Sequence, residues 1–144
     1  TRRSGQLLRK GDDLWLPYSS PELCQVLSSE GYHAHPASDA WSLGIVLFVC
    51  LTGEVPWQKA DPRDPRFGQE FVPWQKRKST RQPKTFSNFT PRFLRLMRRL
   101  LEPKQDLRAP VEEVDKYVKD RWLLRPPAEH KAKIEGAAGT GEEL

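Results

Sequence analysis

The feature that most constrains the fold is residues 43–51 (LGIVLFVCL), an unbroken run of apolar residues and glycine. A helix that is apolar on every side must be buried on every side. The run is far shorter than the ~20 residues that a helix needs to cross a bilayer. Ser38 or Asp39 can cap its start, and Gly53 is suited to end it. We therefore expect the central helix of a globular domain here.

Two further helices are predicted from capping residues and proline. Ser20 is a favourable cap and Pro21 suits the first helical position, so a short helix begins here and ends near Leu27. Asp64 begins another helix, which Pro73 ends or kinks because proline has no N–H to donate. The apolar face of this helix consists of Phe67, Phe71 and Trp74.

The last two predicted helices are amphipathic. Thr90 caps the first of them and Pro103 stops it. Its apolar side chains recur with helical spacing at Phe93, Leu96, Met97, Leu100 and Leu101. Pro110 opens the second, whose apolar stripe is Val111, Val114, Tyr117, Val118 and Trp122. No convincing strand is present, so the predicted fold class is mainly α.

The remaining segments are predicted to be loops or a tail. Residues 1–18, 28–37 and 76–89 show no sustained period and are expected to be loops, the first and last of them basic. Residues 125–144 contain almost no large apolar side chain, which is typical of a disordered tail. We divide the chain at 1–18, 19–124 and 125–144, with one domain in the middle. Because it does not begin with methionine, we expect a fragment.

The formal net charge is +5, which favours acidic partners. The helix that Thr90 caps carries a basic face of Arg92, Arg95, Arg98 and Arg99. A nucleic-acid-binding helical domain is therefore one alternative, and it predicts a steep salt dependence of binding. A solvated basic surface is the simpler interpretation, and we expect no nucleic acid and no membrane as partners.

The cysteines and histidines predict no metal site. Cys24 and Cys50 are too few for a disulfide framework or a zinc site. Both lie in apolar segments and are expected to be buried thiols in a reducing compartment, the cytoplasm. His33 and His35 share a loop, but no further ligand lies nearby in the sequence. No apolar stretch follows Thr1, so no secretory signal is visible.

Several segments, in order, resemble the second half of a eukaryotic protein kinase catalytic domain. Residues 17–22 (PYSSPE) resemble the end of the activation segment, where kinases carry an Ala-Pro-Glu motif. Residues 39–45 (DAWSLGI) resemble the start of the central helix of the C-lobe, and residues 52–57 (TGEVPW) continue it. Residues 101–108, Glu113-Val114 and Trp122-Leu123 resemble the closing helices.

A closer resemblance is to the Src-homology-3-binding-domain kinases. It rests on the Pro-Tyr before Ser19, on residues 22–24 (ELC) and on residues 70–75 (EFVPWQ). Residues 1–3 resemble the segment directly after the Asp-Phe-Gly motif of these kinases, so residues 1–18 would belong to the activation segment. The resemblance implies the helical C-lobe of a protein-kinase-like fold, without the N-terminal β lobe. It also implies a serine/threonine kinase that transfers the ATP γ-phosphate to proteins.

The resemblance assigns roles to individual residues. Glu22 would pair with Arg108 and tie the activation segment to the last helices. Breaking such a buried pair leaves one charge unpaired and costs roughly 3–5 kcal/mol. Asp39, which can equally be a local helix cap, would accept hydrogen bonds from the backbone of the catalytic loop. Trp41 would pack beneath that loop, where a core role and a functional role are hard to separate.

Trp15, Leu16, Pro17 and Tyr18 would form the loop that positions the substrate peptide. Tyr18 after a proline fits serine/threonine kinases. Trp15, however, stands where most of these kinases have a threonine that touches the catalytic aspartate, and an indole cannot accept a hydrogen bond as a hydroxyl can. This departure leaves a second possibility, a pseudokinase scaffold or interaction module.

Kinases bind ATP and Mg²⁺ through a Gly-rich loop, a lysine–glutamate pair and aspartates that precede the activation segment. No residue of this chain matches any of these groups, so we expect no catalytic and no metal-binding residue here. ATP and Mg²⁺ are expected to bind only to the full-length kinase. The expected partner is a protein substrate. Residues 62–66 contain a P-x-x-P sequence that Src-homology-3-type domains can bind, although a turn and a helix start explain it more simply.

Overall fold

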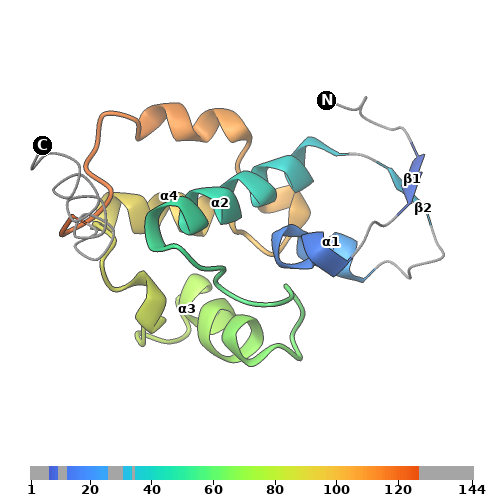
Figure 1. Cartoon of the computed structure of the whole chain (residues 1–144), viewed down its shortest axis with the longest axis horizontal. Coiled ribbons are helices and arrows are strands. Elements are labelled where there is room, and N and C mark those ends of the chain that lie inside the picture. Colours follow the sequence, from blue (N-terminus) through green and yellow to red (C-terminus); the bar gives the residue numbers. More distant parts are fainter. Residues whose placement is uncertain (1–6, 10–12, 26–30, 34, 127–144) are drawn as a thin grey trace, which may run out of the picture.

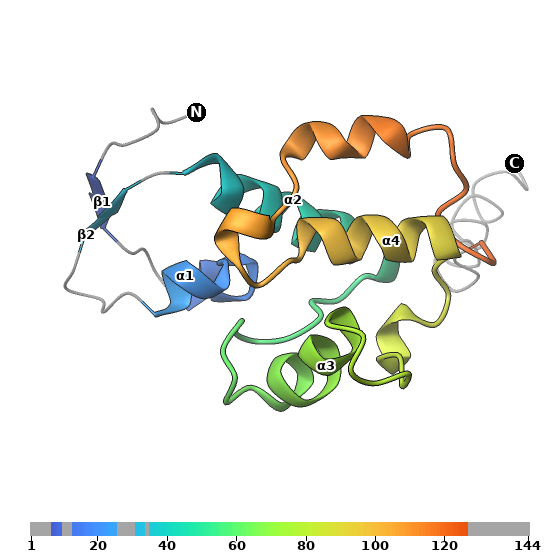
Figure 2. The same ribbon diagram turned by 180° about the vertical axis from the view of Figure 1, so that it is seen from behind.

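A computed structural model describes residues 7–9, 13–25, 31–33 and 35–126, and side chains are described from Leu16 onward, outside the two strands. Its helices are η1 (Asp13–Tyr18), α1 (Pro21–Cys24), α2 (Pro36–Thr52), η2 (Pro65–Phe71), α3 (Val72–Gln75), η3 (Lys84–Phe86), α4 (Pro91–Leu100), η4 (Gln105–Leu107) and η5 (Val111–Lys116). Figure 1 shows α2 and α4 through the middle of the molecule, with α3 and η5 on opposite sides of them, and Figure 2 shows the same arrangement from behind. The predicted mainly α class is confirmed.

The central helix α2 is longer at its start than predicted. His35, and not Ser38 or Asp39, is the cap residue, and its Nδ1 accepts a hydrogen bond of 3.0 Å from Ala37 N–H. Pro36 then occupies the first helical position, which its fixed φ favours. Gly53 ends the helix as predicted, in a left-handed conformation with φ of 83°.

The prediction that this helix is buried on every side is wrong. Trp41, Ile45 and Phe48 are fully buried, but Val46 is 42% exposed and Cys50 is exposed. Among the described residues, helix α4 and several aromatic rings pack against one side of α2, while the side with Val46 and Cys50 is exposed. The rings are those of Trp57, Phe67, Phe86 and Phe89. Cys24 is buried as expected, whereas the expectation of a buried Cys50 is corrected.

Helix α4 confirms its prediction closely. Thr90 Oγ1 accepts a hydrogen bond of 3.2 Å from Phe93 N–H, so the cap lies where the sequence places it. The side chains with helical spacing are all buried: Phe93, Leu96, Met97, Leu100 and Leu101. They pack against α2 and against residues 86–89, a segment that was predicted to be only a polar loop. Phe86 and Phe89 in fact lie in the core, in ring contact with Phe48 at 5.1 and 5.6 Å.

The helix that begins after Asp64 changes its winding at the predicted proline. It runs as the π-helix η2 to Phe71 and continues as the short α-helix α3, whose first turn contains Pro73. Phe67, Phe71 and Trp74 are buried on one face, as expected. Trp57 joins them, with its ring 4.9 Å from Phe67 and 4.8 Å from Phe71.

Gly68 is required where η2 passes the turn before it. A Cβ atom at this position would lie 2.2 Å from the carbonyl oxygen of Pro62. We therefore expect Gly68→Ala to lower the free energy of unfolding by about 3 kcal/mol, the upper part of the usual range for overpacking. Urea denaturation of the whole chain measures this effect. Exposed Gln69→Ala is the control, and an equal cost for both variants would contradict the close approach.

The predicted stripe of the last helix is wrong in part. The segment is the 3-10 helix η5, and the buried Tyr117 directly follows it. Val111 and Val118, by contrast, are 37% and 58% exposed. Glu113 is buried instead, because it forms ion pairs with Arg99 and with Lys116. The inner side of the segment is therefore fixed partly by charge, which apolar periodicity cannot reveal.

Two short strands are a further departure from the prediction. β1 (Leu7–Arg9) and β2 (Gly31–His33) pair antiparallel, with Leu7 opposite His33. Both lie in segments predicted to be loops, since strands of three residues are too short to show alternation. The predicted tail falls almost wholly outside the described residues, as do residues 1–6.

Residues 88–90, just before α4, are hydrogen-bonded to residues 121–125, near the end of the described chain, and we call this pairing the neck. Phe89 and Leu123 form an antiparallel bridge. The side chain of Asn88 donates to Arg125 O and accepts from Arg125 N–H, both at 3.0 Å. Thr90 adds two bonds, from N–H to Trp122 O at 3.0 Å and from Oγ1 to Arg121 O at 2.7 Å.

Candidate functional site

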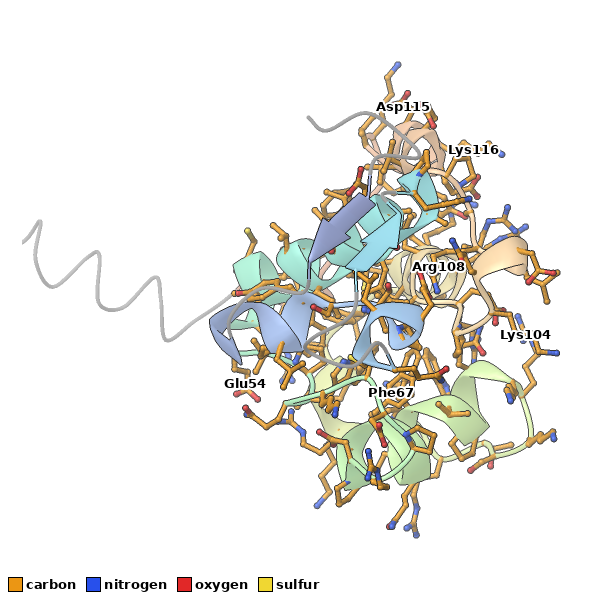
Figure 3. All side chains as sticks on the ribbon, turned by 90° about the vertical axis from the view of Figure 1, so that its right-hand side faces the viewer. Glu54, Phe67, Lys104, Arg108, Asp115 and Lys116 are labelled. Carbon is orange, nitrogen blue, oxygen red and sulfur yellow. The ribbon has the colours of Figure 1, made fainter. Side chains whose placement is uncertain are left out.

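Arg108 is the most completely bonded side chain in the described part of the molecule. It follows η4 directly, its side chain is fully buried, and it lies near the centre of the view in Figure 3. Nη1 and Nη2 donate to Glu22 Oε2 and Oε1 at 2.8 and 2.9 Å, a bidentate pair. The remaining N–H groups donate to the backbone carbonyls of Ala37 (2.9 Å), Glu102 (2.8 Å) and Pro103 (3.4 Å). All five donors of the guanidinium are thereby used.

Glu22 is positioned by the start of α1. Pro21 occupies the first turn and Ser20 is the cap residue, so the carboxylate projects from the helix start towards Arg108. Ser38 Oγ also donates to Glu22 Oε2 at 3.0 Å. Burial alone would raise the pKa of Glu22, but the hydrogen bonds from Arg108, the local backbone and Ser20, with the Arg108 charge, outweigh it and lower the pKa from 4.5 to about 2.

This lowered pKa predicts a pH dependence. The folded chain holds the proton of Glu22 less tightly than the unfolded chain, so the stabilisation is present above pH 4.5 and is lost as pH falls towards about 2. In Glu22→Gln this contribution is absent. We expect the difference in urea midpoint between the two chains to shrink as pH falls from 5 to about 2. A difference that stays constant across this range would contradict the assignment.

Trp41 lies directly beside the pair. Its ring is fully buried and lies 5.0 Å from the guanidinium carbon of Arg108, within the range of cation–π attraction. It also contacts Trp57 and Phe67, each with ring centroids 6.0 Å away. Its Nε1 has no hydrogen-bond partner among the described residues. Trp41 thus joins the ion pair to the aromatic core.

Asp39 has a different environment from the other predicted site residues. It lies in the first turn of α2, is exposed, and is not the cap residue. With His35, Asp106 and Glu112 it lines an open cavity of about 390 Å³ that also reaches Arg108. The structure therefore brings Asp39 to the same end of α2 as the ion pair.

The predicted positioning loop forms the 3-10 helix η1. Leu16 and Tyr18 are half-buried against the core, and Pro17 lies between them. Ser42 Oγ, on α2, donates to Tyr18 O at 2.9 Å and so fixes the loop to the central helix. The side chain of Trp15 lies outside the described part of the structure. Ser38 and Ser42, which hold the pair and the loop, were not predicted, because a serine near a helix start has many possible roles.

The P-x-x-P sequence does not have the extended conformation that Src-homology-3 domains bind. Asp64 N–H donates to Asp61 O at 2.8 Å, which closes a turn over residues 61–64. The Asp64 carboxylate then accepts four backbone N–H groups, from Gln58, Lys59, Arg66 and Phe67. The segment is a turn followed by a helix cap, which is the simpler of the two interpretations of this sequence.

No group of three or more His, Cys, Asp or Glu side chains in the described residues could hold a metal ion. In addition, none of the described helices is long and apolar enough to span a membrane.

Comparison with known proteins identifies the family. The protein kinase domain matches residues 14–123. The serine/threonine-protein kinase SBK1 of Danio rerio is 40% identical over 124 residues, which are 86% of this chain and 32% of that protein. The serine/threonine-protein kinase meng-po of Drosophila melanogaster is 36% identical over 85% of this chain and 27% of its own length. The serine/threonine-protein kinase SBK2 of Homo sapiens is 34% identical over 142 residues, which are 96% of this chain and 40% of that protein.

The chain thus spans well under half the length of these curated relatives. The matched residues nevertheless include all of α1, α2 and α4 and η1 from its second residue, together with both partners of the Glu22–Arg108 pair. A match over most of the chain, with relatives that are all named serine/threonine-protein kinases, leads to one conclusion. The chain belongs to the protein kinase domain family and is similar to its Src-homology-3-binding-domain members.

Proposed function

We propose that this chain is the peptide-binding, lower part of a serine/threonine protein kinase that transfers the ATP γ-phosphate to protein Ser or Thr. Its own contribution is the loop of Trp15, Leu16, Pro17 and Tyr18 that positions the substrate, and the helical scaffold that holds this loop. The exposed side of α2 around Val46 supports the proposal, because further segments of a kinase domain could cover it. The cytoplasm is the proposed compartment, since two cysteines are too few for the disulfide framework of a small secreted domain.

The observation that carries the proposal is the Glu22–Arg108 pair. It joins residues that are 86 positions apart and fixes α1, directly after the positioning loop, to the segment after α4. Ser42 holds the loop itself through Tyr18 O. A substrate peptide next to this loop would therefore meet a rigid backbone, which is how positioning lowers the barrier of a transfer reaction.

ATP and Mg²⁺, when bound by the full-length kinase, supply the phosphoryl group and neutralise its charge. The residues of this chain would position the substrate peptide and would not bind ATP. Asp39 and Trp41, at the same end of α2 as the ion pair, would support the catalytic loop from below. Asp39 is exposed and available to accept hydrogen bonds, whereas Trp41 would act through packing.

A pseudokinase scaffold is the second candidate, and Trp15 is the feature that favours it. A chimera tests both: the matching 124 residues of the Danio rerio SBK1 kinase are replaced by those of this chain. We expect transfer of labelled phosphate from ATP to a degenerate Ser/Thr peptide library, and loss of that transfer in the Arg108→Ala chimera. Exposed Arg95→Ala is the matched control.

The Trp15→Thr chimera separates the two candidates. If the chimera with Trp15 is folded and inactive while the threonine variant is active, the scaffold is the correct function. Circular dichroism confirms folding in each case. A folded chimera that is inactive with either residue, beside an active parent kinase, would contradict the kinase proposal.

A further inference from the structure

One part of the chain concentrates its positive charge. Residues 71–101 contain nine Lys and Arg residues and not one Asp or Glu. Because the whole chain has a formal net charge of +5, all other residues together carry −4. The segment includes α3, η3, α4 and their connections. The net positive charge of the chain is therefore concentrated in one segment, which contains the helices α3 and α4.

Few of these cations are neutralised by acids of the described residues. Arg92 pairs with Asp120 at 3.0 Å, and Arg99 pairs with Glu113. The others have no carboxylate oxygen of a described residue within 4.0 Å. Six of them are exposed: Lys76, Arg77, Lys78, Arg81, Lys84 and Arg95. We call these six residues, together with Arg98, the α3–α4 basic face.

Contacts between the two helices place part of this face together. Gln75 Nε2 donates to Arg98 O at 3.2 Å, and Arg98 Nη2 donates to Trp74 O at 3.3 Å. The Arg98 guanidinium lies over the Trp74 ring at 3.8 Å. Lys76 and Arg77 directly follow α3, and Arg95 lies one helical turn before Arg98 on α4, so both helices contribute cations at one junction.

The junction is held rigidly and remains electrostatically unfavourable. Arg77 has φ of 60°, a left-handed conformation that costs energy in a residue other than glycine. Lys78 N–H and Ser79 N–H both donate to Pro73 O, at 2.8 and 3.2 Å, and fix this turn. Burial and the charge of Arg77 both lower the pKa of Arg98. An anion at this place would relieve the repulsion without reordering the backbone.

We propose that the α3–α4 basic face binds an acidic or phosphorylated segment of a partner protein. Clusters of arginine recognise carboxylates and phosphates through charge-assisted hydrogen bonds. The face shares no residue with the peptide-positioning loop on η1, so this binding is additional to the proposed function.

Two other classes of partner fit the face less well. Trp74 and Phe86 are only 4% and 1% exposed, so neither aromatic ring beneath the face is free for a base to stack on. The exposed large apolar side chains of the described residues, such as Leu107 and Val118, lie outside residues 71–101, so nothing on this face would insert into a bilayer. A protein segment that carries several negative charges is the partner that the described side chains favour.

Fluorescence anisotropy of the whole chain tests the proposal with three labelled hexapeptides. One contains glutamate, one contains phosphoserine and one contains glutamine. We expect the two anionic peptides to bind and the glutamine peptide not to bind. The variant Arg77→Gln/Arg95→Gln should weaken anionic binding by about tenfold or more, as for the loss of two charge-assisted contacts.

The matched control is Lys119→Gln/Arg125→Gln, which removes the same charge from exposed positions outside the face. It should change the affinity by less than about twofold if only unspecific attraction is lost. Lys78→Gln/Lys84→Gln replaces the first variant if circular dichroism shows that the first one unfolds. Equal weakening by variant and control would overturn the proposal, as would tighter binding of a single-stranded hexanucleotide or of phosphatidylserine vesicles. Kinase activity of the chimera is measured separately, so failure here leaves the proposed function intact.

Discussion

Replacing Arg108 with alanine should lower the free energy of unfolding by about 3–5 kcal/mol, the range for removal of one partner of a buried ion pair. The variant leaves the half-buried Glu22 carboxylate without its bidentate donor. It also removes the donors to the carbonyls of Ala37 and Glu102. Urea denaturation of the whole chain measures the loss, and Arg95→Ala, an exposed arginine on α4, should stay within about 0.5 kcal/mol of the wild type.

A double-mutant cycle with Glu22→Gln isolates the pair itself. Each single variant already removes the same contact, so the double variant should cost clearly less than the sum of the two. The loss in Arg108→Ala should exceed that in Glu22→Gln, because only the arginine also bonds three backbone carbonyls. Strictly additive losses would show that the two side chains do not interact in solution.

Trp41→Ala should have an effect of similar size, about 3–5 kcal/mol, which is usual for a large buried aromatic residue. The ring is fully buried and contacts Trp57, Phe67 and the guanidinium of Arg108. Trp41→Phe should cost much less, because a ring remains and the unpartnered Nε1 donor is removed. Thermal and urea unfolding of both variants measures the difference.

The same pair of variants separates the two possible roles of Trp41. If the side chain acts only in the core, a chimera with Trp41→Phe should keep its kinase activity as it keeps its stability. A stable Trp41→Phe chimera with strongly reduced phosphate transfer would instead show that the indole supports the catalytic loop directly. Equal stability of Trp41→Ala and the wild type would contradict the packing described for α2.

The elements that the sequence predicted well are those with a local signal. For α4, a capping threonine, a first-turn proline and an apolar period coincide at one place, and the structure has the helix there. Pro73 marks a real change of helix type for an equally local reason. The strands and the inner side of η5 depended on partners elsewhere in the chain, and local patterns do not contain that information.

The exposure of α2 shows a second limit. A run of apolar residues predicts that a helix needs to be buried, but it does not show which segments cover it. In the described residues Val46 and Cys50 are exposed although the run that contains them is apolar throughout. Phe86 and Phe89 show the opposite error, since a mostly polar segment supplies two core rings.

For the candidate site, the local sequence alone could not predict the Glu22–Arg108 pair. Glu22 and Arg108 are far apart in the sequence, and nothing in their local context links a helix-start glutamate to an arginine near the chain's end. The resemblance to kinases supplied that link, and the structure brings the two side chains to 2.8 Å. The supporting hydroxyl groups of Ser38 and Ser42 were missed, because their roles depend on where α2 lies relative to η1 and α1.

The neck between residues 88–90 and 121–125 determines where the chain can be shortened. It closes a ring that contains the whole of α4, η4 and η5, and its hydrogen bonds are almost all made by Asn88 and Thr90. The entropic cost of closing a ring grows only slowly with its length, so a few bonds at one point can hold a long segment. A truncation after Asp120 removes every acceptor and donor on one side of this closure, whereas a truncation after Pro126 retains them all.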